Sequence, residues 1–198
     1  MSSWEQTASV LIREAQLRGR VRELAHEIEK ALPGSDEAPV LVGVLKGSTL
    51  FLADLIRAFE SHVEVDFISI SSYAGGSRSG VVRIVKDLEI DVRGRDVVIV
   101  EDIVDTGLTL NYLRQTLMDR ETRSLRAVTL LDKAARRIVP VELEFSGFEI
   151  PDEFVVGYGL DFQGRYRNVP YILAVKDIAK LANEPTLLVE PLFLEKGA

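Results

Sequence analysis

Three short, continuous apolar runs constrain the fold of this chain most. Residues 39–45 read PVLVGVL, residues 96–101 read DVVIVE, and residues 125–132 read LRAVTLLD. Strands covered on both faces have continuous apolar sequences of this kind, whereas half-exposed strands alternate. Helix-like segments separate the runs, and this alternation is typical of a parallel sheet with right-handed crossovers. The sequence therefore predicts an α/β fold whose central, mostly parallel sheet is flanked by helices.

The segments between these runs have the patterns of helices and of further strands. An apolar residue recurs every three or four positions over residues 9–32, which predicts one amphipathic helix. Strands at 62–71 and 81–87 would flank a glycine- and serine-rich loop and form a long, flexible hairpin. We also expect helices over 49–60 and from the turn near residue 107 to about residue 120, and strands over 154–161 and 171–178.

The composition excludes several kinds of site. The chain has 198 residues, which suits one domain. It has no cysteine, so disulfides and thiolate metal sites are excluded, and with two histidines, His26 and His62, a histidine-rich metal centre is excluded as well. Lys and Arg number 24 against 31 Asp and Glu, and the resulting net charge of −7 argues against a nucleic-acid partner.

The two ends of the chain suggest where the protein works. The start, MSSWEQTASV, lacks the basic residues and the apolar core of a signal peptide. No apolar run approaches the roughly 20 residues that span a bilayer, so we expect a cytoplasmic protein with no membrane partner. Residues 185–198 are apolar but interrupted by prolines, and they are expected either to pack back on the chain or to contact another subunit.

Residues 97–110, VVIVEDIVDTGLTL, combine a buried strand, a polar turn and the start of a helix. Free backbone N–H groups in the turn and the positive end of the helix can hold a phosphate. The hydroxyls of Thr106 and Thr109 can add donors. The carboxylates of Glu101 and Asp102 can accept from sugar hydroxyls or bind Mg²⁺. The segment therefore predicts a site for a phosphorylated sugar.

The same segment resembles the phosphoribosyl-diphosphate (PRPP) binding motif of the type I phosphoribosyltransferases. That motif has two acids, two apolar residues and Asp-Thr-Gly-x-Thr after a hydrophobic strand. Four further segments resemble those of the hypoxanthine-guanine branch of this family and occur in its order: VLKGS at 44–48, SSY at 71–73, LLDKAARR at 130–137 and EFVVGYGLDFQGRYRNVPYI at 153–172.

The resemblance implies the type I phosphoribosyltransferase fold, with residues 1–198 as a single domain. A small hood would be formed by terminal segments, about 1–15 and 145–198, and by the hairpin loop. The implied reaction is Mg²⁺-dependent transfer of 5-phosphoribosyl from PRPP to hypoxanthine or guanine, giving IMP or GMP and pyrophosphate in purine salvage. Relatives are commonly dimers or tetramers, so we expect a homo-oligomer.

The resemblance also implies roles at the phosphate turn. Asp105 would be the general base or acid at N7 of the purine, and the ordinary alternative is a helix N-cap. Glu101 and Asp102 would bind the ribose hydroxyls, directly or through Mg²⁺. The 5′-phosphate would be held by Asp105, Thr106, Gly107, Leu108 and Thr109. Leu108 stands where some relatives have a lysine, so one charged contact is absent there.

Further roles are implied outside the turn. Lys133 would donate to the 6-oxo group of the purine and reject adenine, unless it is a surface lysine in a basic run. Phe154 would stack on the purine, unless it is only core, and the Val155 backbone would read the pyrimidine edge of the base. Asp161, in the same purine-binding segment, would anchor Mg²⁺ on the pyrophosphate. Pyrophosphate would be bound by Lys46, Gly47 and Arg167, after a cis Leu45–Lys46 peptide, and Ser72 and Tyr73 would form the lid.

Three rival interpretations stay open. One is an enzyme of the same fold that prefers xanthine or a pyrimidine, because the contacts at the 2-position of the base are largely backbone. Another is a regulator that keeps the fold as a PRPP sensor and binds nucleic acid. The last is a simple nucleotide-binding scaffold.

Overall fold

The computed structural model describes residues 4, 6–32, 34, 36–72 and 82–194. The chain forms two compact units, and each unit has its own sheet. The larger unit comprises residues 20–151, and the smaller unit combines residues 1–19 with residues 152–198.

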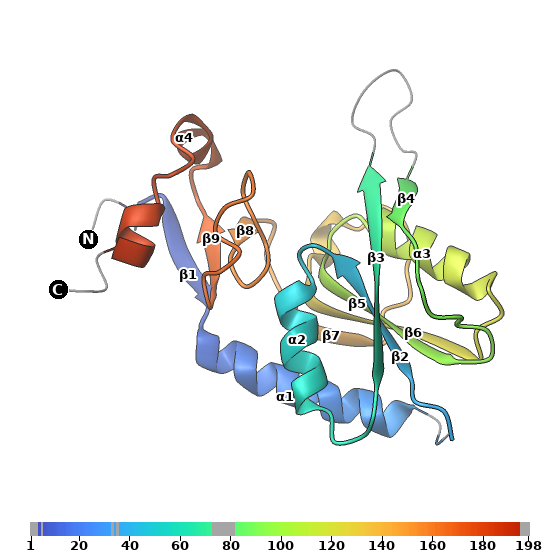
Figure 1. Cartoon of the computed structure of the whole chain (residues 1–198). Coiled ribbons are helices and arrows are strands. Elements are labelled where there is room, and N and C mark those ends of the chain that lie inside the picture. The colour runs from blue at the N-terminus through green and yellow to red at the C-terminus, as the bar shows by residue number, and fades with distance from the viewer. Residues whose placement is uncertain (1–3, 5, 33, 35, 73–81, 195–198) are drawn as a thin grey trace. The chain divides into compact units, whose positions relative to one another are not determined.

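The larger unit is built on a six-stranded sheet with the strand order β4-β3-β2-β5-β6-β7 (Figure 1). Five strands run parallel, and β4 at the edge pairs with β3 antiparallel. The predicted mostly parallel sheet is therefore confirmed. The strands are β2 (Val40–Leu45), β3 (Glu64–Ser72), β4 (Val82–Lys86), β5 (Asp96–Val104), β6 (Ser124–Asp132) and β7 (Phe145–Glu149).

Two helices of this unit cover opposite faces of the sheet (Figure 1). A Cβ built at Gly43 of β2 would lie 2.7 Å from Leu52, so this position faces α2 (Thr49–Ala58). Neighbouring positions of the strands face α3 (Leu108–Met118) instead, in a cluster that includes Val40, Val42, Val44, Val97, Ile99, Leu110, Leu113, Leu117 and Ala127. Both faces of the central strands are thus covered, which explains their continuous apolar sequences.

The order of the strands creates a switch point between β2 and β5. These two strands are neighbours, but the chain leaves β2 toward β3 on one side and leaves β5 toward β6 on the other. In open α/β sheets, ligands bind beyond the carboxyl ends of the strands at such a point. A ligand site is therefore expected at the residues that follow β2 and at the carboxyl end of β5.

The first predicted helix begins later than expected. Residues 9–12 belong to the strand β1 (Ala8–Ile12), and α1 covers Glu14–Ala31. Three apolar residues in a short segment fit a strand as well as the start of a helix, and here pairing with a distant strand decided between them. In the larger unit, Arg20 of α1 donates to the carbonyl oxygens of Ser146 and Gly147 in β7.

The smaller unit contains an antiparallel sheet with the order β1-β9-β8. β8 (Phe154–Val156) and β9 (Ile172–Val175) were expected as strands, but we placed them wrongly in the parallel series. Apolar sequence identifies a buried strand and does not say which sheet it joins. The unit also contains α4 (Ile178–Asn183) and a π-helical turn (Glu190–Leu194). Leu188 and Leu192 are buried in its core, so this part of the tail packs back on its own unit.

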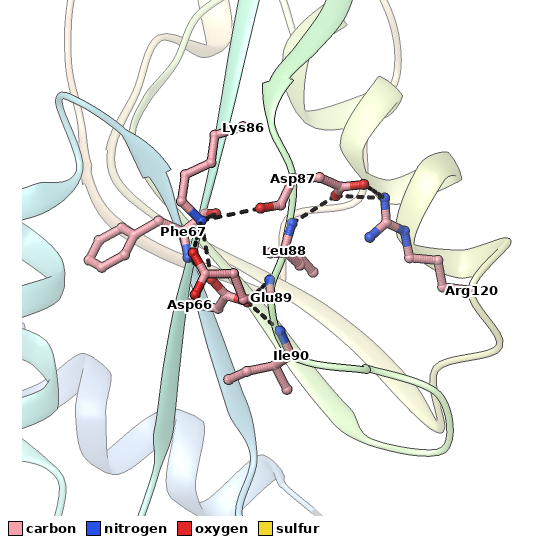
Figure 2. Close-up of polar contacts among 8 residues, drawn as sticks. All are labelled: Asp66, Phe67, Lys86, Asp87, Leu88, Glu89, Ile90 and Arg120. Atoms are coloured by element: carbon pink, nitrogen blue, oxygen red, sulfur yellow. Dashed lines mark hydrogen bonds and ion pairs between the residues drawn. The ribbon is translucent and has the colours of Figure 1, made fainter.

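A buried carboxylate joins β3 to the segment that follows β4 (Figure 2). Asp66 accepts hydrogen bonds from the backbone N–H groups of Phe67, Glu89 and Ile90, at 2.7, 2.7 and 2.9 Å. The Nζ of Lys86 lies 3.7 Å from the same carboxylate. Burial alone would raise the pKa of Asp66, but the hydrogen bonds and Lys86 outweigh it, so the pKa lies below its ordinary value. Asp66 is therefore a charged carboxylate that stabilises the fold by joining β3 to the segment after β4.

Candidate functional site

The loop after β2 touches the acidic end of β5 in the larger unit. Gly47 is buried, and a Cβ built there would lie 1.5 Å from Oδ2 of Asp102. Only glycine allows this approach of backbone to carboxylate. The Leu45–Lys46 peptide is cis, as predicted, and Lys46 is exposed. Lys46 and Gly47 therefore lie at the switch point together with Asp102.

Strand β5 reaches Val104, three residues further than predicted, so Asp102 belongs to the strand together with Glu101. Glu101 is 4% exposed, and none of the described residues forms a hydrogen bond with its Oε1. Burial, and then the charge of Asp102, raises the pKa of Glu101 well above its usual range. A buried carboxylate oxygen without a donor favours a bound cation or hydroxyl donor at Glu101.

Gly107 shapes the turn between β5 and α3. Its φ of 85° lies in the left-handed region, and a Cβ there would come within 2.9 Å of Arg137. Gly107 is also the N-cap residue of α3, so the alternative that Asp105 caps this helix is wrong. Leu108, the first residue of α3, donates its N–H to Oγ1 of Thr106 at 3.4 Å. The turn from Asp105 to Thr109 thus leads into the amino end of a helix, which favours an anion.

The segment that follows β6 is hydrogen-bonded to this turn. The Lys133 N–H donates to the carbonyl of Val104 at 3.0 Å, and the N–H groups of Ile138 and Val139 both donate to the carbonyl of Thr106, at 3.0 and 3.3 Å. The Lys133 side chain is buried, so the alternative of a surface lysine is wrong. The residue expected to read the base and the turn expected to hold the phosphate therefore form one connected structure.

Two arginines that sequence reasoning missed strengthen this connection. Arg137 donates through Nη1 to the carbonyl of Asp105 at 3.0 Å and forms an ion pair with Asp132. The Nε of Arg136 lies 3.0 Å from Oδ1 of Asp105. In the sequence both arginines look like part of a solvent-exposed basic run. Their position three and four residues after Lys133 is the sequence feature that could have indicated a role in the site.

The smaller unit holds four of the predicted site residues. Phe154 is half-buried, and its ring packs edge-to-face on Phe162 at a centroid distance of 5.7 Å. Val155 is buried and pairs with Ala174 across the sheet.

The remaining two form an ion pair, Asp161 with Arg167. Asp161 also accepts from the Gly164 N–H at 2.6 Å, and Arg167 donates to the carbonyl of Gly159 at 2.5 Å. A ligand of either side chain must therefore compete with the other.

The lid prediction falls mostly beyond what the structure describes. The backbone of Ser72 ends β3, and Tyr73 lies outside the described residues. Among the described residues there is no group of three or more His, Cys, Asp or Glu side chains that could hold a metal ion. No described helix is long and apolar enough to cross a membrane.

Comparison with known proteins gives consistent matches. A family model for the phosphoribosyl transferase domain matches residues 13–163. Hypoxanthine phosphoribosyltransferase of Escherichia coli is 52% identical over 167 residues, which cover 84% of this chain and 94% of that protein. Hypoxanthine-guanine phosphoribosyltransferase of Bacillus subtilis is 47% identical over 168 residues, with 84% and 92% covered.

Longer proteins and solved structures match as well. The chain is 49% identical over 168 residues to a bifunctional protein TilS/HprT of Listeria innocua, of which it spans 26%. A crystal structure of a hypoxanthine-guanine phosphoribosyltransferase from Bacillus anthracis superposes with a TM-score of 0.80 at 46% identity, covering 84% of this chain and 98% of the other.

Proposed function

The chain belongs to the phosphoribosyltransferase family, whose members are enzymes of the glycosyltransferase type. We propose that it acts on PRPP and a 6-oxopurine. It transfers the 5-phosphoribosyl group to hypoxanthine or guanine, and releases IMP or GMP and pyrophosphate. The observation that carries this proposal is the connection between Lys133 and the turn at Thr106. That connection links a buried donor for the base to a turn that favours a phosphate.

PRPP is held at the switch point of the larger unit. The 5′-phosphate lies at the turn from Asp105 to Thr109, where backbone N–H groups and the amino end of α3 favour an anion. The ribose hydroxyls donate to Glu101 and Asp102. A ribose hydroxyl thereby supplies the hydrogen bond that Oε1 of Glu101 lacks within the described structure.

Specificity for the base comes from Lys133. Its ammonium group donates to the 6-oxo group of hypoxanthine or guanine, and a charged hydrogen bond of this kind contributes roughly 1.5–3 kcal/mol. Adenine has an amino group at this position, so donor would meet donor and adenine is rejected. Phe154 stacks on the purine, supported by Phe162, and the Val155 backbone contacts the pyrimidine edge.

Asp105 takes the proton that the purine loses. The bond between C1′ of the ribose and the base nitrogen forms as the bond from C1′ to pyrophosphate breaks, and the base proton at N7 passes to the carboxylate. General acid–base catalysis contributes typically about 10²–10⁴-fold. The side chain of Asp105 is 41% exposed, so a substrate can reach it.

The acids of the larger unit fit Mg²⁺. This ion is usually bound by one or two carboxylates together with substrate phosphates, which is what Glu101, Asp102 and PRPP supply. When bound, the ion neutralises negative charge on the phosphates. Lys46, Gly47 and Arg167 bind the leaving pyrophosphate, and Asp161 would hold Mg²⁺ on it, in competition with its ion pair with Arg167.

The test is nucleotide formation from PRPP and Mg²⁺ with hypoxanthine, guanine, xanthine, adenine and uracil offered separately. We expect turnover of hypoxanthine and guanine and refusal of adenine and uracil. Turnover of uracil, or of adenine at a comparable rate, would contradict the role of Lys133. If PRPP binds but no base reacts, the chain is a sensor that has kept the fold.

A further inference from the structure

The carboxylate of Asp105 presents its two oxygens very differently. Oδ1 is buried and lies 3.0 Å from Nε of Arg136, an ion pair whose geometry is not that of a hydrogen bond. The whole side chain is nevertheless 41% exposed. Because Oδ1 has almost no exposed surface, Oδ2 is the only carboxylate oxygen that a substrate could reach.

Arg136 is placed for this contact by the segment that carries Lys133. A single 3₁₀ turn, Ala134–Arg136, follows Lys133, and the Arg136 N–H closes it by donating to the Lys133 carbonyl at 2.9 Å. The next residue, Arg137, binds the backbone carbonyl of Asp105. Consecutive arginines therefore contact Asp105 at its main chain and at its side chain.

We propose that Arg136 is a positioning residue for Asp105. The inference rests on the proposed function, in which Asp105 accepts the purine proton. Arg136 occupies Oδ1 and keeps Oδ2 turned toward the accessible side, where the proton arrives. A carboxylate held in one orientation loses less freedom in the transition state than one that rotates, and small misplacements of reacting groups are costly.

Two competing roles for Arg136 lead to different kinetic outcomes. Arg136 is 48% exposed, so it could bind a substrate phosphate directly, in which case its removal would raise the KM for PRPP. It could also be an ordinary surface ion pair, whose removal would change nothing. Arg93 supplies the matched control, since it pairs with Glu121 at 3.5 Å, with exposed fractions of 73% and 77%.

The experiment compares Arg136→Ala, Arg136→Lys and Arg93→Ala, and places Arg136→Ala also in the Asp105→Asn background. We expect Arg136→Ala to lower kcat about tenfold, a part of the 10²–10⁴-fold typical of acid–base catalysis, with the KM for PRPP changed less than about twofold. Arg136→Lys keeps a positive charge near Oδ1 and should recover part of the loss. Arg93→Ala should match the parent protein.

The double variant tests whether Arg136 acts through Asp105. If it does, Arg136→Ala has no further effect on the residual kcat of Asp105→Asn, because the two effects are not additive. An equal loss in both backgrounds, or a loss confined to KM, overturns the inference. An unchanged kcat for Arg136→Ala, with Asp105→Asn impaired, also overturns the inference but leaves the proposed function intact. If Asp105→Asn itself turns over normally, the proton-acceptor role fails and the inference fails with it.

Discussion

Strand β5 buries one acid at its amino end and another in its carboxyl half, and the surroundings of the two acids are opposite. Asp96, at the amino end, accepts from Nε of Arg123 at 3.0 Å and from the hydroxyl of Ser124 at 2.6 Å. Burial alone would raise its pKa, but these partners outweigh burial and the pKa lies below its ordinary value. Glu101, in the carboxyl half, is buried beside Asp102, and burial and that neighbouring charge raise its pKa well above the usual range. Asp96 has its hydrogen-bond donors within the fold, whereas Oε1 of Glu101 has none among the described residues.

This difference separates a structural acid from a functional one without reference to relatives. Asp66 belongs with Asp96, because backbone N–H groups and Lys86 satisfy it. Buried polar groups without partners cost free energy and persist where something outside the chain satisfies them. Substitutions at the two ends of β5 can therefore test the functional and the structural acid separately.

The largest effect is expected at the functional end, from Gly47→Ala. The new Cβ would overlap the carboxylate of Asp102, which lies 1.5 Å away, so the acid or the loop must move. A displacement of about 1 Å near reacting groups can lower turnover about 10²-fold. Steady-state kinetics with PRPP and hypoxanthine measure the loss.

The control for that variant is Gly19→Ala in α1, where the added Cβ would meet nothing within 4 Å apart from its chain neighbours and the backbone of its own helix. It should leave turnover unchanged and stabilise the helix by about 0.5–1 kcal/mol. Normal turnover in Gly47→Ala would mean that Asp102 does not need its present position.

At the structural end, Asp96→Asn should destabilise the fold by about 2 kcal/mol at pH 7, because a nearly buried charged partner of Arg123 is lost. Since the folded pKa of Asp96 is depressed, its contribution is present above the unfolded pKa, and is lost as pH falls through the folded value. Urea unfolding at pH 7 and pH 3 should show the difference between variant and parent shrinking in acid. A difference that stays constant would mean that the charge of Asp96 is not what stabilises this end.

Glu101→Gln should have the opposite pH dependence. A raised pKa means that the folded protein keeps a proton that the unfolded chain has lost, so stability falls as pH rises from the unfolded pKa toward the folded one. Glutamine does not titrate. Urea unfolding from pH 5 to pH 8 should therefore show the parent losing stability relative to the variant, by at most about 1.4 kcal/mol per pH unit. Parallel curves would contradict the unsatisfied state of Glu101.

The smallest effect is expected from Ser124→Ala, which removes one hydrogen bond to Asp96 and leaves Arg123 in place. A net loss of about 1 kcal/mol is typical of one such bond, and urea unfolding at pH 7 would measure it. Turnover should not change. A loss larger than that of Asp96→Asn would show that the hydroxyl, and not the charge, matters at this end.

The sheet could be predicted from sequence because covered strands need continuous apolar residues, and the runs at 39–45, 96–101 and 125–132 all became central strands. Membership of a sheet could not be predicted. β1 pairs with β9 across at least 160 residues of chain, as with Ala8 and Val175, and β9 in turn pairs with β8; the local sequence pattern does not show which strands pair. The extension of β5 from Asp102 to Val104 was missed because a second carboxylate after the apolar run looks like the start of a loop.

The candidate site was predictable as a set of residue types and not as a set of contacts. The motif around Asp105 and the position of Lys133 indicated which side chains matter. The contact of Gly47 with Asp102, the ion pair of Asp161 with Arg167 and the roles of Arg136 and Arg137 depend on distances between segments. The isolation of Glu101 is likewise a property of its neighbours, which a sequence does not specify.

The carbonyl of Thr106 accepts two amide protons, those of Ile138 and Val139, and this makes the pair a natural reporter of local opening. Hydrogen exchange of these amides requires the segment after β6 to separate from the turn before α3, whereas exchange in the middle of β5 requires the sheet to open. The two rates can be followed in one protein without a label. They distinguish a molecule that unfolds as a whole from one whose neighbouring loops part and rejoin while the sheet stays intact.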